Sequence, residues 1–266
     1  MHNQTITEVE NKFTYLENGS VTSAKGFQAT GIHCGIKKKN KDLALIYSKV
    51  PAEAAGVYTL NKAKAAPVTI CEDITKQNGK AKAIICNSGN ANACTGFEGH
   101  LDALEVQKKC AEVLKINSNE VLISSTGVIG ERLNVSAIVN SLYTLKNNLN
   151  DEGGILAAEA IMTTDLVSKH FAVKVQLSSG EITIGGIAKG SGMIMPNMAT
   201  MLGFVTTDAK IEKEVLQSAL SESVNDSYNK ISVDGETSTN DMVLMLANGM
   251  SNVEVEKDSN DYQIFT

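Results

Sequence analysis

The chain has 266 residues, enough for one large or two ordinary domains, and 42% of them are hydrophobic while 20% are charged. This composition predicts a globular protein with a sizeable core and excludes wholesale disorder. The formal net charge of -6 argues against nucleic acid as the main partner, because phosphate binding needs a basic face.

Cysteine and histidine show no metal-ligand spacing, although the chain has five cysteines and four histidines. We interpret the cysteines as reduced thiols, which predicts a cytoplasmic protein without a metal site. The opening Met1-His2-Asn3-Gln4 lacks the apolar stretch of a signal peptide, and no apolar run is long enough to span a bilayer. The basic run at 37–39 with Lys41 is interpreted as a solvated turn rather than a phosphate-binding patch.

Short apolar runs alternate with helical patterns in the first part of the chain, which predicts a layered α/β architecture. Buried strands are expected at 43–47, 83–86 and 121–125. Helices are expected at 97–115, 135–149 and 155–162, and in the first of them the apolar residues fall on one face.

The next part of the chain begins with a predicted β-hairpin. Apolar and polar residues alternate over 173–177, a turn follows at 178–180, and Ile182 and Ile184 resume the alternation. A glycine-rich stretch at 185–197 follows and is expected to be irregular.

Three further elements are expected towards the end of the chain. A strand is predicted at 200–206, and Asp208 is a candidate N-cap for the helix that follows it. The apolar run at 242–247 predicts a central strand, which needs a neighbour on both edges.

Segments rich in Gly, Asn, Ser and Thr follow buried strands at three places, 86–96, 124–130 and 189–200. Small polar residues just past strand ends are where α/β folds place ligands. Each segment alone is equally well interpreted as a turn, but three in one chain favour a binding site.

Several common catalytic motifs are missing. The glycines at 185–192 match neither the dinucleotide-binding fingerprint nor the P-loop, and there is no Gly-x-Ser-x-Gly elbow. Asp234, Glu236 and Asp241 are candidates for paired carboxylates, with a solvated turn and a cap as the alternative. What remains is a hydroxyl nucleophile without an obvious histidine partner.

Thr200 has a chemical solution to that problem. If the peptide bond before it is cut, its own α-amine, with a pKa of about 7.7–8.0, can act as the base. Glycines upstream permit unusual dihedral angles, Pro196 stiffens the approach, and Ala199 leaves the preceding carbonyl uncrowded.

The segment at 189–202, Lys-Gly-Ser-Gly-Met-Ile-Met-Pro-Asn-Met-Ala-Thr-Met-Leu, closely resembles the self-cleavage segment of the ornithine acetyltransferase (ArgJ) family. Cleavage in that family falls between the residues that match Ala199 and Thr200. The resemblance covers nearly the whole chain and includes the segments 25–27, 31–37, 42–46, 61–68, 87–96, 124–131, 162–165 and 234–241.

The resemblance implies a layered α+β sandwich of the ArgJ/DmpA-like type within the α/β class. Residues 1–199 would form the α chain and residues 200–266 the first part of the β chain, in an α2β2 heterotetramer. The implied enzyme is a glutamate N-acetyltransferase of arginine biosynthesis, which moves acetyl from N2-acetyl-L-ornithine to L-glutamate by a ping-pong mechanism. It needs no cofactor, and the use of acetyl-CoA as a second donor stays open.

Site residues follow from the resemblance position by position. Thr200 matches the nucleophile, and Thr126 with Gly127 matches the oxyanion hole. Lys189 and one of the pair Thr163 and Thr164 match substrate contacts.

Two alternatives stay open. The first is another self-processing amidase or aminopeptidase, which would use Thr200 but deliver the acyl group to water. The second is an inactive fragment, because family members continue past residue 266 and supply further substrate contacts there. On this reading the strand at 242–247 lacks a neighbour, and the chain is aggregation-prone.

Overall fold

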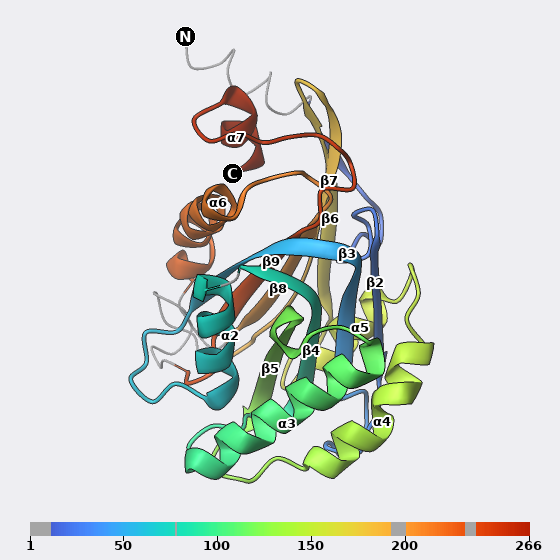
Figure 1. The fold of residues 1–266 in the computed structure, drawn as a ribbon, viewed down its shortest axis with the longest axis vertical. Helices are drawn as coiled ribbons and strands as arrows, with labels where there is room; N and C mark the ends of the chain where they lie inside the picture. The colour runs from blue at the N-terminus through green and yellow to red at the C-terminus, as the bar shows by residue number, and fades with distance from the viewer. Residues whose placement is uncertain (1–11, 78, 193–200, 232–237) are drawn as a thin grey trace.

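The computed structural model describes residues 12–77, 79–192, 201–231 and 238–266. Within them one mixed sheet runs in the order β1-β6-β7-β8-β9-β3-β4-β5, with β2 paired to β3 (Figure 1). Its strands are β1 (Phe13–Tyr15), β2 (Phe27–Ile32), β3 (Leu43–Tyr58), β4 (Lys80–Asn90), β5 (Val121–Val128), β6 (Lys169–Leu177), β7 (Gly180–Lys189), β8 (Leu202–Thr207) and β9 (Met242–Ala247). The helices are α2 (Ala66–Gln77), α3 (Gly96–Leu114), α4 (Val135–Asn147), α5 (Gly154–Ile161), α6 (Lys213–Asp226) and α7 (Asn260–Phe265), with short 3-10 turns η1 (Ser118–Glu120) and η2 (Tyr228–Lys230).

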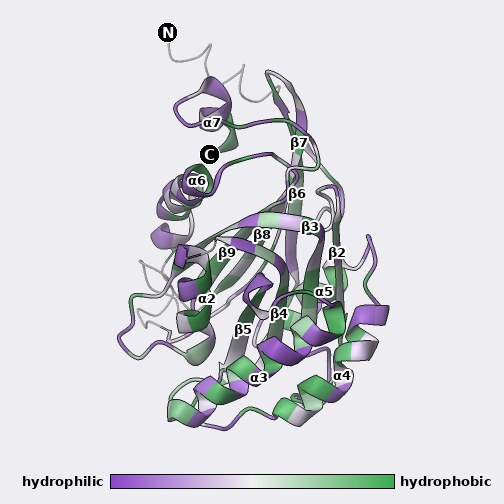
Figure 2. Cartoon of the chain, in the orientation of Figure 1, coloured by the Kyte–Doolittle hydropathy of each residue, from purple (hydrophilic) through white to green (hydrophobic). Residues whose placement is uncertain are grey.

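Helices cover the sheet in two groups, each with its own hydrophobic cluster. Helices α2 to α5 bury their apolar residues with β2 to β5, whereas α6 and α7 pack with β6, β7 and β9. Figure 1 shows α3 and α4 at one end of the molecule and α6 and α7 towards the other. Figure 2 shows hydrophilic and hydrophobic residues in turn along α3, as expected of a helix with one buried face. This layered α/β arrangement is the one expected from the sequence.

Strand β9 lies at the centre of the sheet, between the two clusters. Met242, Leu244 and Leu246 belong to one cluster and the residues between them to the other, because successive side chains of a strand point to opposite faces. The strand pairs with β3 on one edge and β8 on the other. The expected central strand is therefore confirmed, and the expectation that it lacks a neighbour is wrong.

Strand β3 is far longer than the expected 43–47, because it serves both halves of the sheet. Its first part pairs with β4 through Tyr47, and its last part, from Glu53, pairs with β9. The register against β4 shifts between Tyr47 and Ala52. Pro51 lies in this irregular stretch, where a missing backbone N–H costs least. Because of the proline and the polar residues before it, the sequence pattern did not predict that the strand continues.

The remaining expected elements are confirmed with small changes of boundary, except in two places. The hairpin β6–β7 continues to Lys189, so the first five residues of the stretch expected to be irregular belong to a strand. Asp208 is no N-cap, because α6 begins at Lys213 after Glu212. The Asp208 carboxylate is buried and accepts the backbone N–H groups of Lys25 and Thr183 instead.

Among the described residues no helix is long and apolar enough to cross a membrane. The five cysteines are free, and Cys71, Cys86 and Cys110 are buried. In that same part of the chain, no group of three or more His, Cys, Asp or Glu side chains is arranged to hold a metal ion.

Candidate active site

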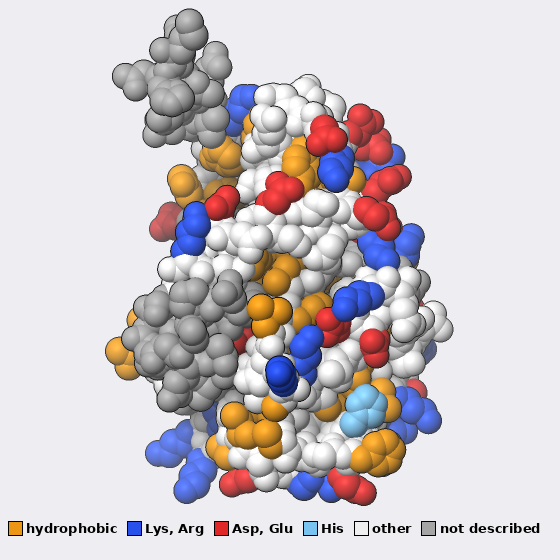
Figure 3. All heavy atoms as spheres, turned by 90° about the vertical axis from the view of Figure 1, so that its left-hand side faces the viewer, with side chains coloured by type: hydrophobic (Ala, Val, Ile, Leu, Met, Phe, Trp, Pro, Cys, Tyr) orange, Lys and Arg blue, Asp and Glu red, His pale blue; other side chains and the backbone are white. Residues whose placement is uncertain are grey.

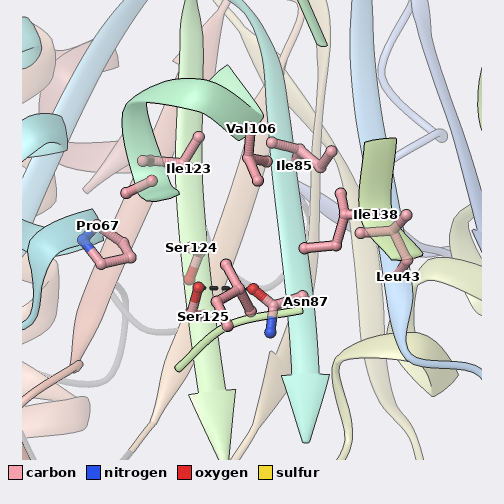
Figure 4. A pocket seen from close by; sticks show the side chains of 11 residues that line it. Leu43, Pro67, Ile85, Asn87, Val106, Ile123, Ser124, Ser125 and Ile138 are labelled. Atoms are coloured by element: carbon pink, nitrogen blue, oxygen red, sulfur yellow. Dashed lines mark hydrogen bonds between the residues drawn. The ribbon is translucent and has the colours of Figure 1, made fainter. Parts of the chain in front are cut away.

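The first two polar segments lie side by side at the carboxyl ends of β4 and β5. These strands are parallel, with Ser88 opposite Thr126 and Gly89 opposite Gly127, so their ends meet at one edge. The Ser125 hydroxyl donates to Asn87 Oδ1 at 2.6 Å across the pair (Figure 4). Small polar residues from two of the three segments therefore meet at one edge of the sheet.

Gly127 adopts a backbone conformation that no other residue tolerates well. Its φ is +136°, and a Cβ added to it would lie 2.3 Å from the carbonyl carbon of Gly89. Gly89 has a positive φ as well, +105°. The backbones of β4 and β5 thus approach closely beside Thr126, which demands glycine on structural grounds alone.

Lys189 joins the third polar segment to the first two. It is the last residue of β7, and its side chain is buried, with 3% of the residue exposed. Its Nζ donates to Thr126 Oγ1 at 3.0 Å. Burial lowers the pKa of Lys189, while the carboxyl groups of Asp165 and Asp241 act in the opposite direction. Two residues assigned to the site from separate segments are therefore in direct contact.

Thr163 and Thr164 are exposed and lie next to the loop that follows Lys189. The Thr164 and Ser191 hydroxyls are hydrogen-bonded at 2.8 Å. Asp165 accepts the N–H of Gly190 at 2.8 Å and also binds the Lys169 ammonium group. These contacts bring the threonine pair to the site, and the choice between the two threonines stays a prediction.

Burial works against ionisation of Asp165, but the bonds from Lys169, Gly190 and Thr163 outweigh it and lower its pKa. The carboxylate is therefore charged at neutral pH. It holds the threonine segment and the Lys189 loop together through that charge.

Lys37 belongs to the frame of the site, which corrects its interpretation as part of a solvated turn. Its Nζ donates to the carbonyls of Lys41 at 2.7 Å and Met162 at 2.8 Å. Burial lowers its pKa, against the opposing effect of the negative charges of Asp42 and Asp165. Lys38 and Lys39 are exposed, as a solvated turn requires.

The predicted nucleophile Thr200 and its neighbour Ala199 lie outside the described residues, as do Asp234 and Glu236. The N–H of Met201 donates to Asp241 Oδ1 at 3.0 Å, and the Met201 carbonyl accepts the N–H of Met242. The residue after the predicted nucleophile is thus held on both sides of its backbone by the start of β9.

Asn240 is a candidate site residue that the sequence pattern did not single out, and Asp241 is one that it offered only as a candidate paired carboxylate or a cap. Asp241 is 1% exposed, so it is not part of a solvated turn. Asn240 Nδ2 donates to the carbonyls of Ala91 at 2.6 Å and Ser125 at 2.8 Å, which ties β9 to both polar loops. The signal that was available is position, since Ser, Thr, Asn and Asp immediately precede the apolar run of β9, as polar residues follow β4 and β5.

Two hollows are poor candidates for the site, one because it is too small and the other because it lies away from the predicted site residues. The cavity drawn in Figure 4 has a volume of about 10 Å³ beneath β4 and β5, which leaves room for a water molecule at most. A groove of about 530 Å³ lies between α2 and α6, on the face where Figure 3 shows hydrophobic, basic and acidic side chains mixed. It is lined by residues such as Tyr58, Leu60 and Gln217, and none of the predicted site residues takes part.

Comparison with known proteins agrees with this geometry. The chain matches the model of the ArgJ family over residues 28–266. It is 52% identical over 239 residues to the arginine biosynthesis bifunctional protein ArgJ of Halalkalibacterium halodurans, which covers 90% of this chain and 58% of that protein. Among solved structures it is similar to ArgJ of Bacillus halodurans, with 48% identity and a TM-score of 0.67 over 70% of this chain and 98% of that one. It is also similar to the ornithine acetyltransferase of Mycobacterium tuberculosis complexed with ornithine, with 36% identity and a TM-score of 0.63 over 69% of this chain and 98% of that one.

The chain spans about three fifths of the length of the curated relatives that it matches. The match nevertheless includes the polar segments at the ends of β4, β5 and β7, together with the start of β9. On this evidence, the chain belongs to the ArgJ family.

Proposed function

We propose that this chain carries the acyl-transfer centre of a glutamate N-acetyltransferase of arginine biosynthesis. It moves an acetyl group from N2-acetyl-L-ornithine to L-glutamate. The names of the relatives support the pathway, and the M. tuberculosis relative complexed with ornithine supports the substrate class. The observation that carries the proposal is the buried contact between Lys189 and Thr126.

That contact prepares Thr126 to act as an oxyanion donor. A threonine hydroxyl has one hydrogen and two lone pairs. Because the Lys189 ammonium group donates to Oγ1, the hydroxyl hydrogen is left for another acceptor. The N–H of Gly127 would supply the second donor. A single donor of this kind contributes roughly 3 kcal/mol to transition-state stabilisation.

Thr200 is the nucleophile in this proposal, after cleavage of the bond between Ala199 and Thr200. Its Oγ attacks the acetyl carbonyl, its α-amine takes the proton, and ornithine leaves. The amine of glutamate then attacks the acetyl-threonine ester and regenerates the hydroxyl. The lengths of the relatives support cleavage, because the curated proteins are longer than this chain while the solved chains are shorter.

The substrate contacts follow the same arrangement. Lys189 offers its charge to a substrate carboxylate. Thr163 or Thr164 provides a hydroxyl from the segment that Asp165 ties to the Lys189 loop. The mature protein is a cytoplasmic assembly of α and β chains, α2β2, which works without a cofactor. Acetyl-CoA is the second donor to be tested.

The test combines mass and activity on the full-length protein. Intact mass should give two chains, and N-terminal sequencing should show that one of them begins Thr-Met-Leu-Gly-Phe. Acetyl transfer from N2-acetyl-L-ornithine should require glutamate. Release of acetate at the same rate without glutamate would favour the self-processing amidase instead. Thr200→Ala serves as the control that should stay uncut and inactive.

A further inference from the structure

Self-cleavage needs a proton acceptor other than the one that the mature enzyme uses. After cleavage the α-amine of Thr200 can take the proton of its own hydroxyl. Before cleavage that nitrogen is the amide of the Ala199–Thr200 peptide bond, and its lone pair is delocalised into the carbonyl group. A different group must therefore accept the hydroxyl proton in the first reaction.

Asp241 is placed at the peptide that follows the nucleophile. Its Oδ1 accepts the Met201 N–H at 3.0 Å, and this N–H belongs to the peptide bond that joins Thr200 to Met201. The contact is set by the sheet, because β8 and β9 are parallel with Leu202 opposite Met242. The carboxyl group is therefore one peptide unit away from the residue whose hydroxyl must lose its proton.

The second carboxyl oxygen of Asp241 has no assigned task in the fold. Oδ2 is buried and makes no hydrogen bond of normal geometry with the described residues, although Ser238 lies near enough to the carboxyl group to favour its charged form. A buried polar atom without a partner costs free energy, and such exceptions call for a specific explanation. Asparagine at this position could accept the same Met201 N–H without carrying an ionisable group. Burying an aspartic acid here costs more free energy than burying an asparagine, which indicates that its ability to take up and release a proton is used.

The charge state of Asp241 suits a base at neutral pH. Burial raises its pKa to about 7, although the Met201 N–H, Ser238 and Lys189 all favour the charged form. Among the described residues, Lys189 on β7 is the titratable side chain whose charge acts on it, and that positive charge favours the carboxylate. A base works best when its pKa lies near the working pH.

We propose that Asp241 accepts the hydroxyl proton of Thr200 during self-cleavage, an inference that rests on the function proposed above. Oδ2 takes the proton while Oγ attacks the carbonyl carbon of Ala199. The C–N bond between Ala199 and Thr200 breaks, and the nitrogen takes the proton back from the carboxyl group. One water molecule then hydrolyses the ester, which leaves a carboxylic acid on Ala199 and restores the threonine hydroxyl.

The test measures the rate of self-cleavage rather than turnover. The full-length protein is made in a short pulse of cell-free synthesis and then transferred to buffers between about pH 5.5 and 8.5, and uncut chain is followed by intact mass. The rate should rise with pH and level off above about 7. Asp241→Asn keeps an acceptor for the Met201 N–H but cannot take the proton, so cleavage should slow at least about 100-fold.

The matched control is Asp208→Asn. Asp208 is also buried and also accepts backbone N–H groups, but it lies just past the other end of β8. This variant should cleave like the parent, and thermal unfolding should show all three proteins folded.

The outcomes separate the two proposals. A parent that cleaves while Asp241→Asn cleaves equally fast would overturn this inference and leave the proposed function standing. A parent cleavage rate that does not change with pH would also overturn this inference and leave the proposed function standing. This measurement decides the question even if Asp241→Asn fails to fold. A parent that stays uncut would overturn both.

Discussion

Lys189 Nζ lies 3.0 Å from Thr126 Oγ1, although 63 positions of sequence separate the two residues. The contact joins the end of β7 to the end of β5, and both residues are buried. A buried ammonium group needs acceptors, and a buried hydroxyl needs a donor or an acceptor, so each residue meets a requirement of the other. In the function proposed above, this pair marks the place of acyl transfer.

Removing the Thr126 hydroxyl should affect the rate much more than substrate affinity. The hydrogen bond to the developing oxyanion strengthens in the transition state, so Thr126→Ala should lower kcat on the order of 100-fold with a small change in KM. Thr126→Ser keeps a hydroxyl and should retain most of the activity. Steady-state kinetics of the three proteins check this, and normal turnover of Thr126→Ala would remove Thr126 from the oxyanion hole.

Gly127→Ala should destabilise the fold as well as the site. An added Cβ would meet the Gly89 carbonyl carbon at 2.3 Å, and a φ of +136° is unfavourable for alanine. The expected loss in the free energy of unfolding is about 3 kcal/mol or more. Gly130→Ala is the matched control, because its φ is also positive, +83°, but nothing lies within 4 Å of the added Cβ. Urea unfolding should show a loss of about 1 kcal/mol for that variant, and equal losses would contradict the clash.

An acetyl-threonine intermediate predicts ping-pong kinetics. With N2-acetyl-L-ornithine and glutamate both varied, double-reciprocal plots of the initial rate should be parallel, because ornithine leaves before glutamate reacts. The measurement uses the full-length protein. Intersecting lines would indicate direct transfer within a ternary complex and would exclude the covalent intermediate.

The buried Asp241 should make stability fall as pH rises towards neutrality. Its pKa in the folded state is about 7, against an ordinary value of 3.8, so the folded protein binds more protons between these two values. The stabilisation is complete below the unfolded-state pKa and is lost as pH rises through about 7. The loss amounts to no more than about 4 kcal/mol, because each pKa unit corresponds to about 1.4 kcal/mol.

Urea unfolding at several pH values checks this in a Thr200→Ala background, where the chain stays uncut. As pH rises from about 5 to about 8, the unfolding free energy of this protein should fall relative to that of its Asp241→Asn version. A difference that is constant with pH would mean that Asp241 does not titrate in this range.

Local patterns in the sequence were sufficient for most elements. Period-two alternation marked β6 and β7, and a one-sided apolar face marked α3, because these patterns depend on neighbours along the chain. The segment at 189–202 was specific enough to indicate the family and to predict Thr200 as the nucleophile. The wider resemblance also named Thr126, Gly127 and Lys189, but without any reason from the sequence for those residues to meet.

The tertiary structure alone decided which polar groups share the site. Asp208 and Asp241 both stand next to a predicted strand, and the sequence pattern offered Asp208 as an N-cap and Asp241 as either a paired carboxylate or a cap. Both are buried, because pairing among β7, β8 and β9 encloses the two ends of β8. Burial depends on strands that are distant in the sequence, and so does the raised pKa of Asp241. The sequence pattern also did not place Lys37 in the site, because its partner Met162 lies 125 positions away. The sequence determined the chemical groups and their local structure, whereas long-range packing determined their surroundings and therefore their reactivity.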